Sequence, residues 1–281
     1  MLLTRVITAL AILPVVLAML FLAPNRAWAL FMLGISLVAC WEWSRMCRFP
    51  GRGAARVFLA GSAIVAGSFY IAYELSPDAL FPQLALASFI VAAYFWIFAV
   101  PAWLYLKLRP APWVCALAGW TAILPAWAAF VVLHDRSPWL LLAAAALVWI
   151  ADIAAYFTGR RFGRVKLAPA ISPGKTREGV LGALAGVLAF GLALKFVSAS
   201  EALPVTVLFA GSGGVVVILL MIALVFVSVI GDLFESWMKR GAGLKDSSGL
   251  LPGHGGVLDR IDALTSTLPV AALLLHLGAP Q

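Results

Sequence analysis

The sequence predicts an all-α polytopic membrane protein with a polar site at its cytoplasmic side. Of its 281 residues, 64% are hydrophobic and only 11% are charged, whereas soluble domains carry about 25% charged residues. A soluble chain of this length needs polar side chains to cover its surface, and a disordered chain is less hydrophobic. Because a membrane-spanning helix takes roughly 20 residues, the chain accommodates about nine spans and no large soluble domain.

Nine apolar segments follow one another along the chain. The fourth and the eighth are longer than a bilayer requires, so we expect them to tilt, to kink at Pro101 in the fourth, or to project into water. All nine belong to one integral membrane unit, with N-terminal helices over 1–140 and a C-terminal region over 141–281 that carries the polar motifs. The segments are 6–23, 27–43, 57–73, 79–106, 112–133, 139–157, 179–198, 205–231 and 263–278.

Basic residues orient these spans. With Arg5 inside and the spans alternating, the inside loops hold 17 of the 20 Lys and Arg residues. The charged residues left for the outside loops are Arg26, Arg136, Glu74, Asp78, Asp135 and Glu201. The positive-inside rule requires this asymmetry, and it explains the net charge of +8 without nucleic acid as a partner. We therefore expect a multi-pass protein of the cell (inner) membrane with its N-terminus in the cytoplasm.

Two features of the N-terminal half have simple interpretations. Arg5, an apolar run and the residues 27–29 resemble a secretory signal with a cleavage site, but the run is long for such a signal. Cys40, Cys47 and Cys115 show no metal-binding spacing, so we interpret them as small buried hydrophobic residues.

Acidic residues in or beside the spans are costly, so each needs a role. Glu42 ends the second span, and Arg45 follows at i+3, so an ion pair at the helix end accounts for it. Asp152 lies near the inner end of the sixth span, with Tyr156 at i+4 on the same helix face. A basic loop that contains Arg160 comes next.

Residues 172–176, Ser-Pro-Gly-Lys-Thr, combine turn residues, two hydroxyls and a cation. They do not form a Walker A loop, because Pro169 stands where that motif needs glycine and no strand is expected before it. We expect Ser172, Lys175 and Thr176 to contact phosphate.

The densest cluster of charges lies at 231–262. If the eighth helix continues through Lys239, then Asp232 shares a helix face with Glu235, Ser236 and Lys239. Carboxylates in pairs near cations suit Mg²⁺ and a polyphosphate, because Mg²⁺ takes one or two carboxylates and leaves other positions to phosphates and water. Gly255 and Gly256 permit close backbone approach to a ligand. The alternative is a salt-bridged cytoplasmic loop, and the density of charge favours a functional site.

Three blocks of this region resemble the phosphatidate cytidylyltransferase family, also called CDP-diglyceride synthases. The matching residues span about 150–270, while the N-terminal 140 residues resemble the family only in being hydrophobic spans. The blocks are Asp152-x₃-Tyr156-x₂-Gly159-Arg160, Ser172-Pro173-x-Lys175-Thr176-x-Glu178-Gly179, and Ser236-x-Met238-Lys239-Arg240-x₄-Lys245-Asp246-x₅-Pro252-x-His254-Gly255-Gly256-x₂-Asp259-Arg260-x-Asp262.

The resemblance implies an enzyme that uses CTP, phosphatidate and Mg²⁺ and releases CDP-diacylglycerol and pyrophosphate. Asp232 and Asp259 correspond to the family's metal-binding aspartates. Such chemistry depends on positioning and charge neutralisation. We expect the triphosphate to be neutralised by Lys239, Arg240, Lys245 and Arg260.

The other predicted site residues have less specific roles. Asp246 and Asp262 orient these cations or help a second metal ion, and His254 either donates to a phosphate or only shapes the turn. Substrate-binding residues are predicted to be Asp152, Tyr156, Arg160, Ser172, Lys175, Thr176, His254, Gly255 and Gly256. The sequence is compatible with a homodimer but does not determine the oligomeric state.

Two other functions are compatible with parts of this pattern. A CTP-dependent polyprenol or phytol kinase also combines a membrane pocket with CTP, and product analysis separates it from a cytidylyltransferase. A transporter places its polar residues at the membrane midplane, whereas the acids here gather at the inner face.

Overall fold

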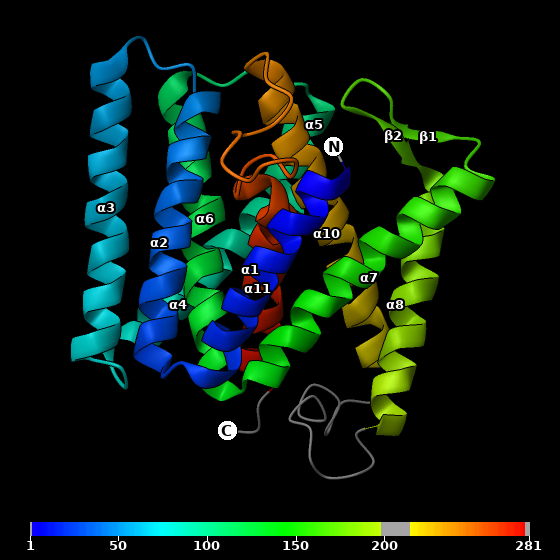
Figure 1. The fold of residues 1–281 in the computed structure, drawn as a ribbon, viewed down its shortest axis with the longest axis horizontal. Helices are drawn as coiled ribbons and strands as arrows, with labels where there is room; N and C mark the ends of the chain where they lie inside the picture. The colour runs from blue at the N-terminus through cyan, green and yellow to red at the C-terminus, as the bar shows by residue number, and fades with distance from the viewer. Residues whose placement is uncertain (1, 198–213, 279–281) are drawn as a thin grey trace.

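The computed structural model describes residues 2–197 and 214–278, which form a bundle of long helices and one small β-hairpin. The connections between successive helices alternate between the two ends of the bundle (Figure 1). Eight of the described helices are long and apolar enough to cross a membrane. The prediction of an all-α polytopic membrane protein is therefore confirmed over these ranges.

Each predicted span that falls on described residues corresponds to a helical segment. The apolar stretch of the first helix, Val6–Leu22, is shorter than the eight others. The predicted span 205–231 begins outside the described residues, and Glu201 also lies outside them. The helices are α1 (Leu2–Leu22), α2 (Asn25–Met46), α3 (Arg52–Leu75), α4 (Leu80–Tyr94), η1 (Phe95–Ala99), α5 (Val100–Tyr105), α6 (Pro112–Arg136), α7 (Pro138–Phe162), α8 (Arg177–Val197), α10 (Gly214–Gly241) and α11 (Leu258–Gly278).

The long fourth span is a helix with a local change of pitch. Helices α4 and α5 are joined without a break by η1, a π-helical turn at Phe95–Ala99. Pro101 follows at the start of α5, and proline cannot donate the hydrogen bond that an α-helix needs at that position. The wider turn accommodates this missing donor, so the expected irregularity at Pro101 is present just before it.

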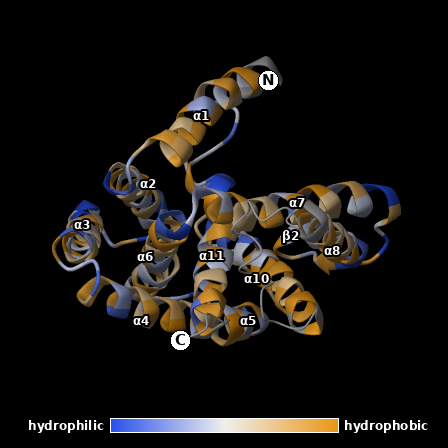
Figure 2. Cartoon of the chain, turned by 90° about the horizontal axis from the view of Figure 1, so that it is seen from below, coloured by the Kyte–Doolittle hydropathy of each residue, from blue (hydrophilic) through white to orange (hydrophobic). Residues whose placement is uncertain are grey.

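Two helices occupy the interior of the bundle. In α6, 78% of the most hydrophobic stretch is buried within the protein, and in α11 61%, against 17% in α3. Figure 2 shows α6 and α11 surrounded by α2, α4, α7 and α10, with α1 set apart from the body. Because α11 begins at a loop rich in charged residues, its central position brings that loop to the middle of one end.

A short antiparallel hairpin stands at that same end (Figure 1). Strand β1 (Lys166–Ala168) pairs with β2 (Ser172–Thr176), with Lys166 opposite Thr176 and Ala168 opposite Ser172. The sequence predicted a loop without strands here, so the hairpin corrects that expectation. It is too short to show the alternating pattern by which strands are identified in a sequence.

Candidate active site

Helix α10 carries the first part of the site on its last three turns. It continues to Gly241, as the predicted alignment of one helix face requires. Asp232 Oδ1 accepts a hydrogen bond from Ser236 Oγ at 3.3 Å. One turn on, Lys239 Nζ lies 3.0 Å from Glu235 Oε2. These i, i+4 pairs confirm that the four polar side chains share a face.

The β-hairpin contributes a cation to this face. Lys175 Nζ on β2 lies 2.6 Å from Asp232 Oδ2, and both side chains are partly exposed. Asp152 on α7 lies close enough to Asp232 and Lys175 for their charges to act on it. Asp262 on α11 is likewise near Asp232. Four separate elements therefore bring charged groups together around Asp232.

A second ion pair joins α10 to α11. Lys239 Nζ lies 2.5 Å from Asp259 Oδ1, and the side chains of Lys239, Glu235 and Asp259 are 11%, 4% and 5% exposed. Among the described residues Glu235 Oε1 has no hydrogen-bond partner. Burying charge is tolerated only when it is paired, so this lysine is held firmly between two acids from different helices.

The other oxygen of Asp259 organises the loop before α11. Asp259 Oδ2 accepts hydrogen bonds from Ser247 N at 2.9 Å, Ser247 Oγ at 2.9 Å and Gly256 N at 2.8 Å. Gly255 has φ +82°, and a Cβ there would come within 2.7 Å of Asp259 Oδ2. A Cβ on Gly256 would overlap Ser247 Oγ and a carboxylate oxygen of Glu42.

One expectation about an individual residue needs correction, and two others gain a local explanation. The groups that approach the glycine pair closely are the side chains of Asp259, Ser247 and Glu42, and a ligand contact at this pair stays a prediction. The expected Glu42–Arg45 ion pair is absent from the described structure, because Arg45 Nη1 donates to Ser247 O at 2.6 Å. Thr176 is buried, and its hydroxyl accepts from Gly179 N at 3.1 Å in the first turn of α8. This side chain therefore caps α8, and its contact with phosphate stays a prediction.

The remaining predicted residues are exposed or half-buried. Arg160 Nη1 donates to Tyr156 Oη at 3.0 Å, and Arg240 Nη1 donates to Leu244 O at 3.2 Å. Ser172 and His254 are half-buried. The exposed residues are Asp152, Tyr156, Arg160, Arg240, Lys245, Asp246 and Arg260. Three of the four cations predicted to meet a triphosphate, Arg240, Lys245 and Arg260, are therefore accessible to solvent.

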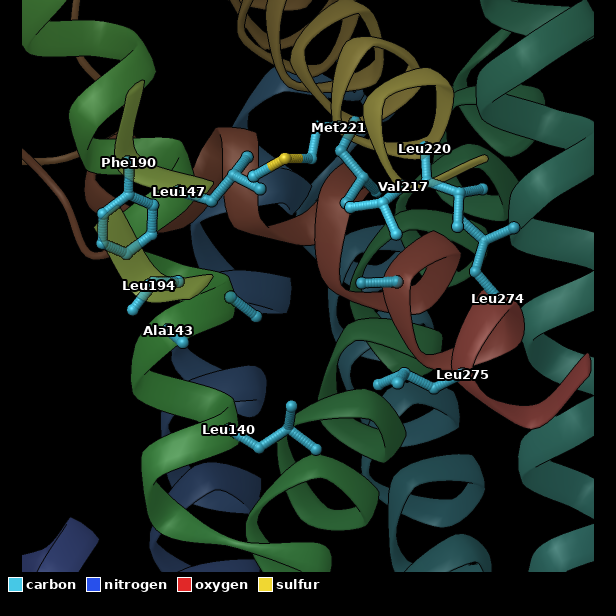
Figure 3. A pocket seen from close by; sticks show the side chains of 13 residues that line it. Leu140, Ala143, Leu147, Phe190, Leu194, Val217, Leu220, Met221, Leu274 and Leu275 are labelled. Carbon is cyan, nitrogen blue, oxygen red and sulfur yellow. The ribbon is translucent and has the colours of Figure 1, made fainter. Parts of the chain in front are cut away.

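An apolar pocket lies between α7, α8, α10 and α11, away from the charged end (Figure 3). Met221, on its wall, precedes Asp232 by eleven residues on α10, which corresponds to about 16 Å along the helix axis. Its lining contains no polar side chain, so it does not suit a nucleotide. The residues around it are Leu140, Ala143, Ala144, Leu147, Phe190, Leu194, Val217, Leu220, Met221, Leu224, Ala271, Leu274 and Leu275.

Comparison with known proteins finds relatives that cover the whole chain. The model of the family described as "Cytidylyltransferase family" matches residues 3–278. The chain is 40% identical to the phosphatidate cytidylyltransferase of Pseudomonas aeruginosa over 100% of both chains. It is 35% identical to the enzyme of the same name from Haemophilus influenzae over 96% of both. The chain is 37% identical to the phosphatidate cytidylyltransferase of Brucella suis over 98% of this chain and 93% of the relative.

Proposed function

The chain belongs to the cytidylyltransferase family, and we propose that it transfers the cytidylyl group of CTP to phosphatidate. The products are CDP-diacylglycerol and pyrophosphate. One structural observation supports this proposal independently of the similarity to the relatives. Two lysine–aspartate ion pairs, Lys175–Asp232 and Lys239–Asp259, lie at one end of a membrane bundle, next to exposed cations. This arrangement suits a polyphosphate and an anionic headgroup at a membrane surface.

The substrates reach this end if it faces the cytoplasm of a cell membrane. The loops at the end with the hairpin are the basic ones (Figure 1), and basic loops remain on the cytoplasmic side. CTP is dissolved in the cytoplasm, and the phosphatidate headgroup lies at the interface. The proposed orientation therefore places both substrates beside the same charged residues.

The residues at Asp232 and Asp259 fit a cation. Each carboxylate already holds a lysine ammonium, so each position is electrostatically suited to positive charge. Among the described residues no group of three or more His, Cys, Asp or Glu side chains could hold a metal ion by itself. Mg²⁺ suits such a site, because it takes few protein carboxylates and completes its octahedron with phosphates and water.

We propose that Asp232 and Asp259 hold Mg²⁺ together with substrate oxygens. Asp232 is the more accessible, at 29% side-chain exposure, whereas Asp259 presents only the oxygen that now faces Lys239. Bound Mg²⁺ supplies charge stabilisation to the phosphoryl oxygens. Asp152 and Asp262 lie near Asp232, and we propose that they help to hold the cation or a second one.

The protein's own residues position the reacting groups. A phosphate oxygen of phosphatidate forms the new bond to the α-phosphorus of CTP, the α–β phosphoanhydride bond breaks, and pyrophosphate leaves with its electron pair. Lys239 is a fixed positive charge, held by Glu235 and Asp259. The exposed side chains of Arg240, Lys245 and Arg260 neutralise the triphosphate and the leaving group. Catalysis of this kind depends on orientation and electrostatic stabilisation.

Other residues of the site support these roles. We propose that Lys175, with Ser172 beside it on the hairpin, binds the second phosphate when substrate separates Lys175 from Asp232. Arg160 of α7 donates a hydrogen bond to Tyr156, and we propose that both side chains contact substrate. Asp246 orients neighbouring cations, and half-buried His254 is available to donate to a phosphate.

The proposal is tested with cytidine-labelled CTP, phosphatidate and Mg²⁺ in membranes that contain the protein. We expect label in lipid and release of pyrophosphate. Label confined to CDP, with a phosphorylated alcohol as product, would indicate a kinase, and no transfer to lipid would indicate a transporter. Asp232→Asn and Asp259→Asn should each abolish transfer. Asp78→Asn should leave it unchanged, because Asp78 is exposed in the connection between α3 and α4, which lies at the end opposite the hairpin (Figure 1).

A further inference from the structure

Glu42, on α2 in the N-terminal half, has its side chain fully buried beneath the loop that carries the site residues. Its exposure is 0%. Its oxygen Oε1 accepts from Ser248 Oγ at 2.5 Å and Val257 N at 2.9 Å. Its oxygen Oε2 accepts from Leu258 N at 2.6 Å and lies 3.2 Å from Ser247 Oγ. We propose that Glu42 is a positioning residue for the active site, an inference that rests on the proposed function.

The four donors come from two ends of one loop. Ser247 and Ser248 lie shortly after α10, while Val257 and Leu258 lead into α11. Backbone N–H groups at a helix start have no partner within the helix, and a carboxylate there is also favoured by the helix dipole. Glu42 therefore caps α11 from a different helix and fastens both ends of the loop to α2.

Asp259 also holds this loop through hydrogen bonds. Asp259 Oδ2 accepts from Ser247 N and Gly256 N, which directly adjoin the residues bound by Glu42. Ser247 Oγ lies within hydrogen-bond distance of both carboxylates. Two acids thus clamp one loop between them, and Arg45 on α2 adds a hydrogen bond to Ser247 O.

This clamp fixes the orientation of Asp259. With Oδ2 held by the loop, Oδ1 is directed at Lys239 Nζ. If the loop loosens at Glu42, Asp259 loses the fixed amide donors that set its direction, and Lys239 loses a fixed partner. Glu42 touches neither of these two side chains through any hydrogen bond of the described structure, so its effect passes through Ser247 and Gly256.

The test compares Glu42→Gln with wild type in the full-length protein, reconstituted in phosphatidylcholine vesicles that contain phosphatidate. Glutamine keeps one acceptor oxygen but turns an NH₂ group toward N–H and O–H donors. We expect kcat/KM for CTP to fall at least tenfold, about 1.4 kcal/mol of transition-state stabilisation. The KM for CTP should rise while the KM for phosphatidate stays constant. Glu74→Gln, on α3 and bonded to Tyr70, is the matched control and should change neither constant.

Hydrogen exchange gives a readout independent of activity. In Glu42→Gln we expect faster amide exchange confined to 244–258, with the spans unaffected. Ser248→Ala removes one donor to Glu42 and should produce smaller changes in the same direction, including when Glu42→Gln fails to insert. The inference is overturned if exchange and both KM values match wild type, or if exchange rises throughout and only the amount of active enzyme falls. A wild type that transfers no label refutes the proposed function instead, while the exchange experiment still tests the clamp.

Discussion

Lys239 provides a quantitative test of the site, because one ammonium compensates two buried carboxylates. Its Nζ lies 3.0 Å from Glu235 Oε2 and 2.5 Å from Asp259 Oδ1, and the three side chains are at most 11% exposed. Lys239→Met keeps most of the stem and removes the charge. Removing one partner of a buried ion pair typically costs about 3–5 kcal/mol, because it leaves uncompensated charge.

We therefore expect Lys239→Met to lower the free energy of unfolding in detergent by about 3 kcal/mol or more. Transfer of labelled cytidylyl groups should fall at least a hundredfold, because the fixed cation and the orientation of Asp259 are lost together. Thermal unfolding and the CTP assay measure these two effects separately. Lys166→Met, at an exposed lysine on β1, is the control and should change the unfolding temperature little.

The double variant Lys239→Met with Glu235→Gln distinguishes stability from activity. Replacing Glu235 removes one of the two uncompensated carboxylates, so part of the lost stability should return while transfer stays low. A wild-type unfolding temperature for Lys239→Met would show that this lysine does not compensate the two carboxylates. A double variant that is less stable than Lys239→Met by as much as Glu235→Gln alone destabilises the wild type would show the same, because residues in one network do not contribute independently.

Three further variants or measurements test other parts of the structure. Gly256→Ala should lower the unfolding free energy by about 1–3 kcal/mol, because its Cβ overlaps its neighbours; an effect no larger than that of Gly249→Ala, where a Cβ meets open space, would contradict this. Lys175→Gln should change stability by less than about 1 kcal/mol, since its ion pair is partly exposed, yet lower kcat/KM at least tenfold; unchanged kinetics would remove Lys175 from the site. The interaction with the Cys115 thiol and burial raise the pKa of the Cys47 thiol, so maleimide at pH 8 should label it only after unfolding in detergent, and mass spectrometry of the folded protein would show any exception.

Local sequence patterns predicted much of the site because its residues occur in a few continuous blocks. Asp232, Ser236 and Lys239 recur at helical spacing, which places them on one face of α10 before any tertiary contact is known. The density of charge in the connection before α11 predicted a polar segment with a functional role. Glu235 was placed on the same face, but nothing in the spacing showed that it would share Lys239 with Asp259, which is contributed by another helix.

Glu42 shows what local reasoning cannot determine. Its sequence neighbour Arg45 offered an ion pair at i+3, whereas its true partners lie more than 200 residues away. The hairpin and the role of Thr176 were missed for a related reason, since a five-residue strand carries too few residues for a recognisable period. The signal that was available for Glu42 is its position, an acidic residue at the end of an otherwise apolar span.

Hydrophobicity and helical period are properties of neighbouring residues, so the amino-acid order was enough to predict the membrane class, the order of the spans and the charged blocks. Which charges meet depends on how the helices pack. The central position of α11 brings Asp259 to Lys239, and the packing of α2 brings Glu42 under the same loop. Buried charges must find partners wherever the fold provides them, and the sequence does not contain those distances.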